Sequence, residues 1–224
     1  MLFQISYSSV YVVTSETINK QAQTVPIERP LTHCVEHDFT QVIDTSDPKQ
    51  FECVHTRGDV PDIIICLYPD ENDVIISKAI RKAGAFEPRL SRMIANAMKR
   101  YPKSKFLDIG ANIGMHTLSL AKLGYDVISV EPKWSTIQRL HKGVNLNHLS
   151  NKITLLTMGL SDVRETLTLH SSAAHPGGSS IQPGHPRVKN LTDTIKTVFM
   201  DDLLEVIAAG QELVVKMEIG RAHV

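Results

Sequence analysis

A glycine-containing segment in the middle of the chain carries the residue types best suited to binding a small ligand. It runs Phe106-Leu-Asp-Ile-Gly-Ala-Asn-Ile-Gly114, a short apolar strand followed by a tight turn and a helical pattern. Glycine lets the backbone approach a ligand closely, and a helix that begins there directs free N–H groups at it. We expect Gly110 and Gly114 to provide this clearance, and Asn112 to occupy a position where left-handed backbone is tolerated.

An acidic residue stands at the matching place of the next strand. Glu131 directly follows the apolar run Val127–Val130 and comes 21 residues after Gly110. A carboxylate at the end of the second strand of such a unit can accept both ribose hydroxyls of a nucleoside. The glycine turn and Glu131 together predict a site for a nucleoside cofactor.

The glycine spacing distinguishes between such cofactors. Dinucleotide sites use G-x-G-x-x-G, which places a pyrophosphate on the helix N-terminus. This chain has G-x-x-x-G preceded by Asp108, which suits a phosphate-free ligand with an amine and a carboxylate. S-adenosyl-L-methionine is such a ligand: Asp108 would meet its ammonium, directly or through water, and the turn amides its carboxylate. The alternatives are an NAD-dependent oxidoreductase, disfavoured by the missing third glycine, and a non-catalytic module that binds a nucleoside cofactor.

Further motifs follow in a fixed order along the chain. They are Asp108–Gly114, Val127-Ile-Ser-Val-Glu-Pro132, Asn145-Leu-Asn147, Gly159-Leu-Ser-Asp162, Val198-Phe-Met-Asp-Asp-Leu203 and Val214-Val-Lys-Met-Glu218. In residue types and order, this set resembles the FkbM family of methyltransferases. The resemblance implies a class I, Rossmann-like α/β fold with helices on both faces of its sheet. It also implies transfer of the methyl group of S-adenosyl-L-methionine, usually to a hydroxyl oxygen.

The resemblance further implies roles for individual residues. Cofactor binding falls to Asp108, Gly110, Asn112 and Gly114 at the methionine end, Glu131 at the ribose, and Leu160, Ser161 and Asp162 near the adenine. A lysine and an acid at the end of the fourth strand face the reaction site in the family, so Lys216 and Glu218 are the expected catalytic residues. Methyl transfer mainly needs two positioned reactants, and a base only as the acceptor hydroxyl loses its proton. The expected acceptor is a small molecule or a glycan.

The remaining elements are those that must position this site. Strands are expected at Phe106–Ile109, Val127–Val130, Ile153–Met158 and Leu213–Met217, with helices at Met115–Leu123 and Trp134–Asn147. Alternating strands and helices demand right-handed crossovers and a parallel sheet. The glycine- and proline-containing stretch Ser171–Arg187 is expected to be a loop.

The chain divides into four segments. Residues 1–50 are expected to form an extended leader or linker, in which 1–13 favour a frayed leader or an edge strand over a signal peptide. Residues 51–104 predict a short β-hairpin and two amphipathic helices, the first capped by Asp73 and ended by Gly84. Residues 105–217 predict the methyltransferase domain.

The last segment, residues 218–224, breaks the family pattern. Reverse-translated and read after its first base, Glu-Ile-Gly-Arg-Ala-His-Val reproduces the start of a common short-read sequencing adapter. We therefore expect 218–224 to be adapter read-through, with only the first base of codon 218 native, and the sheet to be incomplete at its C-terminal side. Such a sheet is expected to keep an open edge, exposing hydrogen-bonding groups that another chain can capture.

Composition limits the remaining possibilities. The 224 residues include 24 Lys+Arg and 24 Asp+Glu, a neutral balance that disfavours a nucleic-acid-binding role. No apolar run approaches the roughly 20 residues that span a bilayer. No metal site is expected, because His33, Cys34 and His37 have ligand spacing without a fourth ligand. Three cysteines decide neither for nor against a secreted location, so the compartment, cytoplasmic or secretory, stays open.

Overall fold

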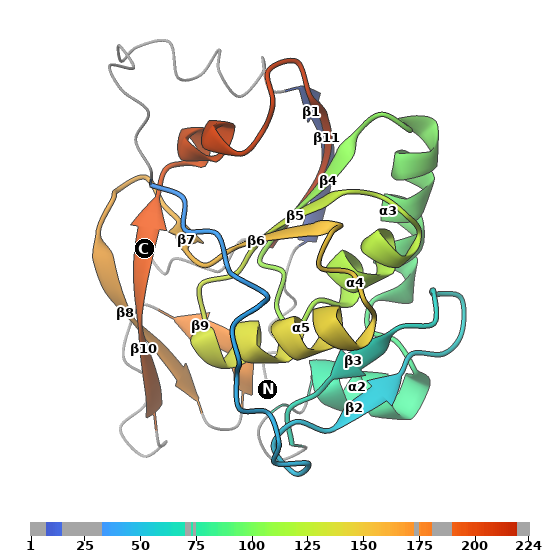
Figure 1. Ribbon diagram of the computed structural model, residues 1–224, viewed down its shortest axis with the longest axis vertical. Helices are drawn as coiled ribbons and strands as arrows, with labels where there is room; N and C mark the ends of the chain where they lie inside the picture. Colours follow the sequence, from blue (N-terminus) through green and yellow to red (C-terminus); the bar gives the residue numbers. More distant parts are fainter. Residues whose placement is uncertain are drawn as a thin grey trace, which may run out of the picture.

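The computed structural model describes residues 8–14, 33–69, 73, 75–172, 175–180 and 190–218. Its centre is a five-stranded sheet in the order β1-β11-β4-β5-β6 (Figure 1). The strands β4 (Lys105–Ile109), β5 (Val127–Val130), β6 (Ile153–Leu156) and β11 (Glu212–Glu218) run parallel, and β1 (Ser8–Thr14) pairs antiparallel with β11. The predicted α/β class with a mostly parallel sheet is confirmed.

The strand order creates a switch point beside β4. The helices α4 (Met115–Lys122) and α5 (Trp134–Leu146) connect β4 to β5 and β5 to β6, moving outward in one direction. The chain then returns so that β11 lies on the other side of β4. In open α/β sheets, ligands bind in the crevice at the carboxyl ends of the strands at such a point. Asp108, the glycine turn and Lys216 all lie there.

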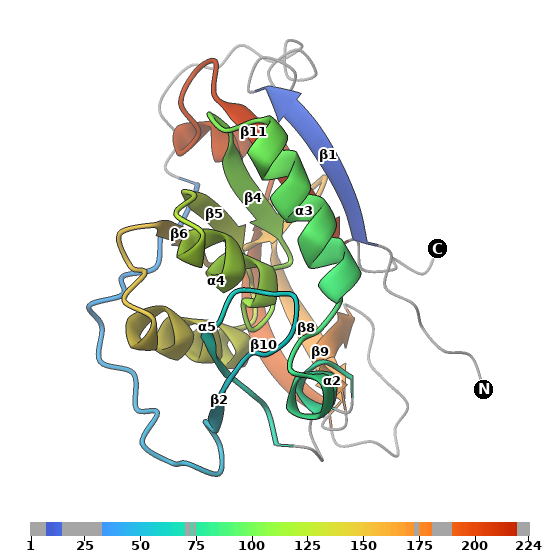
Figure 2. The same cartoon turned by 90° about the vertical axis from the view of Figure 1, so that its right-hand side faces the viewer.

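The two faces of the sheet are covered differently. The helices α3 (Pro88–Arg100), α4 and α5 pack on one face, where Phe106 and Val214 join their apolar side chains in one core (Figure 2). Leu107 and Val215 point the other way, toward a second core that includes Leu203 of the 3₁₀-helix η1 (Met200–Glu205). In the described part of the chain, the expected helices on both faces are therefore three α-helices on one face and a single 3₁₀-helix on the other.

N-terminal residues occupy both edges of the central sheet. Ser8–Thr14 pairs along the whole of β11, so the edge strand proposed within residues 1–13 is confirmed and β11 is not left as an open edge. At the opposite edge, Glu36 forms an antiparallel bridge with Leu156, and the Thr157 N–H donates to Val35 O at 2.9 Å. We call residues 33–37 the edge segment. The strands β11 and β6 thus both have hydrogen-bonding partners from the N-terminal residues, and β1 is the outermost strand on the β11 side.

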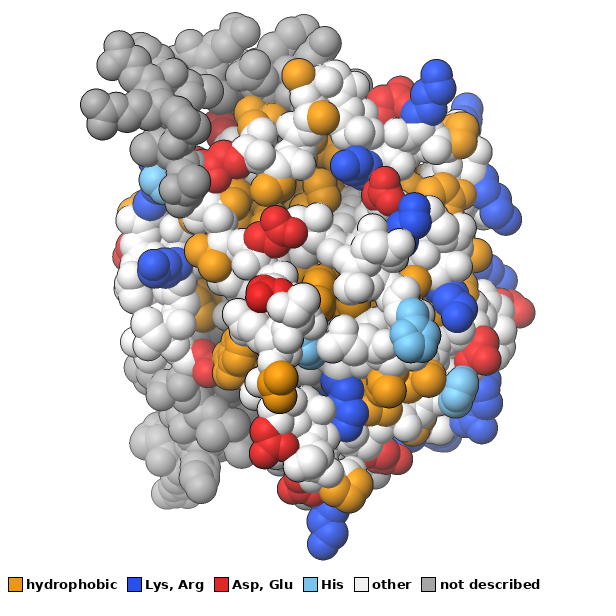
Figure 3. All heavy atoms as spheres, in the orientation of Figure 1, with side chains coloured by type: hydrophobic (Ala, Val, Ile, Leu, Met, Phe, Trp, Pro, Cys, Tyr) orange, Lys and Arg blue, Asp and Glu red, His pale blue; other side chains and the backbone are white. Residues whose placement is uncertain are grey.

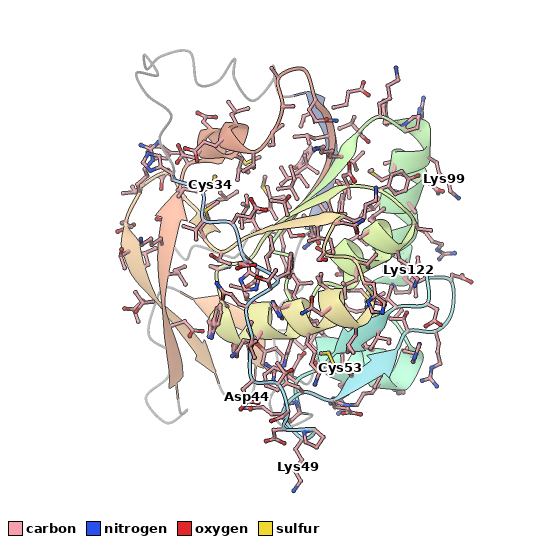
Figure 4. The ribbon with its side chains drawn as sticks, viewed as in Figure 1. Cys34, Asp44, Lys49, Cys53, Lys99 and Lys122 are labelled. Carbon is pink, nitrogen blue, oxygen red and sulfur yellow. A yellow bond between two sulfur atoms is a disulfide. The ribbon has the colours of Figure 1, made fainter. Side chains whose placement is uncertain are left out.

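Residues 51–104 contain the predicted hairpin and helices. The hairpin consists of β2 (Cys53–His55) and β3 (Ile64–Cys66), joined by a Cys53–Cys66 disulfide (Figure 4). The Asp73 carboxylate accepts the N–H groups of the first turn of α2 (Ile76–Ala83), and Gly84 ends this helix at φ 83°. The predicted cap and stop are confirmed, and Pro88 begins α3.

A second, smaller sheet forms the crossover from β6 to β11. Its order is β7-β10-β8-β9, with β7 (Gly159–Leu160), β8 (Thr166–Ser172), β9 (His175–Ser180) and β10 (Asn190–Val198). The expectation of a loop over Ser171–Arg187 is wrong where β9 pairs antiparallel with β8. Sheet pairing of the backbone overrode the weak strand propensity of glycine and proline there. Residues 181–189 lie outside the described residues.

The described surface is mixed in charge. Acidic and basic side chains are interspersed on the face shown in Figure 3, without a continuous basic surface there. Within the described residues, no helix is both long and apolar enough to cross a membrane.

Candidate active site

A small cavity opens at the switch point, where β4 and β11 end and α4 begins. Its lining comes from the glycine turn, the start of α4, the end of β11, the start of α2 and the segment before α3: Ile76, Phe86, Glu87, Gly110, Ala111, Asn112, Ile113, Met115, His116, Lys216 and Glu218. A second hollow lies at the opposite, amino-terminal ends of β4 to β6, among Lys105, Asp126 and Lys152. Only the first hollow contains sequence-predicted site residues, so the chemistry is sought there.

Asp108 and Lys216 form a buried ion pair beneath this cavity. Asp108 Oδ1 lies 3.2 Å from Lys216 Nζ, and both side chains are almost fully buried. Oδ2 of Asp108 accepts the hydroxyl of Thr117 at 2.7 Å, and Lys216 Nζ donates to Gly110 O at 2.7 Å. Lys216 thereby links β11 to the glycine turn. Because Asp108 has no exposed surface, the expected direct contact between its carboxylate and a ligand does not occur in this arrangement.

Lys216 is held in its charged form. Burial alone would lower the pKa of Lys216, but the charges of Asp108 and Glu218 outweigh burial and raise the pKa above its ordinary value. Glu218 Oε2 lies 3.5 Å from Lys216 Nζ, and its side chain is 31% exposed. Lys216 is thus a fixed cation rather than a base. Of the two carboxylates beside it, Asp108 is buried and Glu218 faces the cavity.

The amides of the glycine turn are already bonded within the protein. The N–H groups of Gly110 and Ala111 both donate to Val130 O, at 3.0 and 3.1 Å, and the Gly114 N–H donates to Ala111 O. The Asn112 N–H donates to the Glu131 carboxylate, and the Ile113 N–H to the Asn112 side chain. The expectation that free turn amides receive a ligand carboxylate is therefore wrong for residues 110–114.

The glycines serve packing more than ligand clearance. A Cβ on Gly114 would lie 2.3 Å from Leu140 Cδ1 of α5, and one on Gly110 would lie 3.2 Å from Glu218 Cβ. Both have positive φ, 93° and 76°. Asn112 has φ 52°, which confirms its predicted left-handed conformation. The turn is therefore tight because it must fit between α5 and the end of β11.

Glu131 is brought to the same turn from the end of β5. Its two oxygens accept the N–H groups of Asn112 at 2.9 Å and Lys133 at 3.0 Å. Burial raises the pKa of Glu131 to about 7, against the lowering effect of these two hydrogen bonds, and the charge of Glu218 adds to the rise. Each carboxylate oxygen has a second lone pair, so ribose hydroxyls could still donate to it.

The residues expected near an adenine lie elsewhere. Leu160 packs with the second core, on the face covered by η1. The Ser161 N–H donates to Val198 O, and Ser161 Oγ lies 3.3 Å from Asp162 Oδ1. None of these three residues lines the cavity. The structure therefore brings together seven of the ten predicted site residues: Asp108, Gly110, Asn112, Gly114, Glu131, Lys216 and Glu218.

Sequence reasoning missed several side chains that complete the site. Thr117 and Ser129 share a hydrogen bond of 2.8 Å and extend the Asp108 network along the helix-covered face. A second group, Glu87, Ser91 and His116, lies between α3 and the start of α4. The signal that could have indicated Thr117 is its place in the first turn of α4, where a helix that follows β4 faces the sheet.

Neither the scan against protein-family models nor the search of curated proteins found a match to this chain. In the described residues, no cluster of three or more His, Cys, Asp or Glu side chains could hold a metal ion.

Proposed function

We propose that this chain is an S-adenosyl-L-methionine-dependent methyltransferase of the FkbM type, acting on a hydroxyl of a small molecule or glycan. The observation that carries the proposal is a convergence at the switch point. A buried carboxylate, Glu131, and a buried ammonium, Lys216, reach the same glycine turn from two neighbours of β4. The family pattern requires an acid after the strand that corresponds to β5, and a lysine and an acid at the end of the strand that corresponds to β11.

The residues present fit this cofactor at its ribose end. Glu131 would accept the ribose hydroxyls, because it is a desolvated carboxylate beside the turn. Glu218, partly exposed and lining the cavity, is the acid available to the methionine ammonium, while Asp108 acts by fixing Lys216. The bound cofactor supplies an electrophilic methyl group. The protein's own task is to orient the acceptor hydroxyl, exclude water and take up one proton.

Cofactor binding tests the proposal without knowledge of the acceptor. S-adenosylhomocysteine should raise the unfolding temperature and give a calorimetric binding isotherm, whereas NAD should give neither. Ligand at 100 times its Kd stabilises a folded protein by about 2.7 kcal/mol, which is easily measured.

Two variants make this experiment specific. Glu131→Gln should lose most of the S-adenosylhomocysteine affinity, and Glu165→Gln, at an exposed position, should keep it. Protection by NAD alone would support the oxidoreductase alternative. Binding of neither ligand by the unmodified chain would refute the proposal.

A further inference from the structure

Within the described residues, His116 is the one imidazole that lines the cavity. It is the second residue of α4 and is 5% exposed. The charged groups that share its cavity are Glu87 from the start of α3, and Lys216 and Glu218 from β11. His116 therefore lies between two helices and the end of the strand expected to face the reaction.

The hydrogen bonds of Ser91 determine which nitrogen of His116 carries the proton. Ser91 Oγ lies 3.4 Å from Glu87 O, four residues back, where a serine in a helix donates. With its proton directed there, the hydroxyl oxygen is an acceptor, and it lies 3.2 Å from His116 Nδ1. His116 Nδ1 is accordingly the N–H donor, and Nε2 keeps its lone pair.

Glu87 faces this free nitrogen. Its Oε2 lies 3.7 Å from His116 Nε2. A carboxylate at that distance favours the protonated imidazole, so it stabilises His116 once Nε2 has taken up a proton. Glu87 holds this position with φ 46°, a left-handed conformation that is uncommon for a residue other than glycine. Strained backbone of this kind concentrates at functional sites.

The other ionisable groups of the site are poorly placed to accept a proton. Lys216 is already an ammonium, bonded to Gly110 O and paired with Asp108. Glu131 is buried and bonded to two backbone amides, and Glu218 is paired with Lys216. His116 Nε2, 3.7 Å from Glu87, is the remaining ionisable nitrogen of the cavity lining that such bonds do not engage.

We propose that His116 is the base that accepts the proton of the acceptor hydroxyl, with Glu87 stabilising the imidazolium that forms. This inference rests on the proposed methyltransferase function. In the step, the acceptor oxygen forms a bond to the methyl carbon, and the carbon–sulfur bond of the cofactor breaks with its electron pair passing to sulfur. The hydroxyl proton moves to His116 Nε2. Glu87 and Ser91 are positioning residues.

Imidazole ¹⁵N NMR of the whole chain tests this assignment without an acceptor. The His116 signals are identified by their loss in His116→Asn. The proton is expected on Nδ1, and Ser91→Ala should remove that preference. At a fixed pH near 7, Glu87→Gln should lower the ratio of protonated to neutral His116, while Glu165→Gln, the exposed control, should not.

Two cofactor analogues then measure how close His116 lies to the reacting methyl group. Sinefungin carries a positive amine where the cofactor has its methyl sulfonium, whereas S-adenosylhomocysteine is uncharged there. A base next to the methyl group should be about tenfold less protonated with sinefungin than with S-adenosylhomocysteine. Calorimetry of both ligands on each variant confirms that the complexes form.

The outcomes separate the two proposals. If both analogues bind but leave the His116 protonation equal, or if the proton lies on Nε2, His116 is not the base and the methyltransferase proposal stands. If neither analogue binds the unmodified chain, the methyltransferase proposal fails and this inference fails with it. If His116→Asn does not fold, its signals are assigned from Glu87→Gln and Ser91→Ala instead.

Discussion

Glu131 holds its proton more tightly than an exposed glutamate does, because only two backbone amides replace the water that it loses on folding. Its pKa of about 7 places the titration of this carboxyl at neutral pH. A carboxylate accepts ribose hydroxyls better than the protonated acid does. Affinity for the proposed cofactor, S-adenosyl-L-methionine, is therefore expected to rise as the pH increases through about 7.

The same shift makes stability depend on pH. Below pH 4.5, the ordinary value, Glu131 is protonated in both the folded and the unfolded chain. Between there and about 7 the unfolded chain loses this proton first, so the contribution of Glu131 to stability falls as pH rises. Glu131→Gln lacks this effect. Urea unfolding should show the variant gaining about 2 kcal/mol relative to the original chain between pH 5 and 8.5. Parallel pH profiles for the two proteins would contradict the assignment.

The Asp108–Lys216 pair is expected to be costly to break from one side. Lys216→Met leaves a buried carboxylate without its partner and should reduce the free energy of unfolding by about 3–5 kcal/mol. Adding Asp108→Asn should restore part of that loss. Lys152→Met is the matched control, because its pair with Asp126 is exposed and should be worth less than about 1 kcal/mol. Equal losses for Lys152→Met and Lys216→Met in urea unfolding would refute the distinction.

At the scale of elements, the start of α4 depends on Gly114 for two separate reasons. Its φ of 93° disfavours any other residue, and a Cβ there would collide with Leu140 of α5. Gly124 has a similar φ of 96° but nothing within 4 Å of where a Cβ would lie. A substitution at Gly124 therefore measures the cost of the backbone conformation without a collision. Gly124→Ala should cost about 1–2 kcal/mol. Gly114→Ala should cost about 1–3 kcal/mol more, because α5 must move. Similar losses in thermal or urea unfolding would show that α5 does not press on the turn.

Elements with local signals were predictable from sequence, and pairings between distant segments were not. Asp73 before an apolar helical stripe and Gly84 after it predicted α2, because capping depends on neighbouring residues. The turn at Asn112 was predictable for the same reason. By contrast, β1 pairs with a strand about 200 residues away, and the glycine-containing β9 is a strand only because β8 lies beside it. Nothing local reveals either partner.

The candidate site divides in the same way. Glu131 follows one apolar strand, and Lys216 and Glu218 lie at the end of another. Parallel strands bring their carboxyl ends to one edge of the sheet, so the convergence of these residues was predictable. That the turn amides are already bonded depends on Val130 O and Glu131, which reach the turn only in the folded sheet. The cluster of Glu87, Ser91 and His116 depends on how α3 packs against α4. Side-chain contacts across a helix interface leave no periodic signal in the sequence.

At the scale of the whole molecule, the edge segment is fastened to α5 by two histidines. His37 Nε2 and His141 Nδ1 are 2.8 Å apart, and His141 Nε2 lies 2.9 Å from Asn145 Nδ2. Burial lowers the pKa of His37, and the nearby His141 lowers it further; burial also lowers the pKa of His141. The folded chain therefore keeps both rings neutral at a pH where the unfolded chain begins to protonate them.

The contribution of this histidine pair to stability is accordingly expected to fall as the pH drops through 6.5, the ordinary value for histidine. In the double variant His37→Gln/His141→Gln, the urea-unfolding midpoint should decrease less between pH 7.5 and pH 5 than in the original chain; we call this decrease the acid limb. His148→Asn replaces an exposed histidine and should leave the limb unchanged. An unchanged limb in the double variant would show that the acid sensitivity arises elsewhere.

The pairing of β1 with β11 also bears on when the protein folds during its synthesis. Ser8 is opposite Glu218 in that ladder, so roughly 200 residues must be made between the two partners. At about 5–20 residues per second, that interval lasts about 10–40 s. Throughout it, the apolar strand that leaves the ribosome first has no partner, and the central sheet lacks one edge. The ladder closes only after β11 emerges, so the central sheet is completed at a late step of the synthesis of these residues.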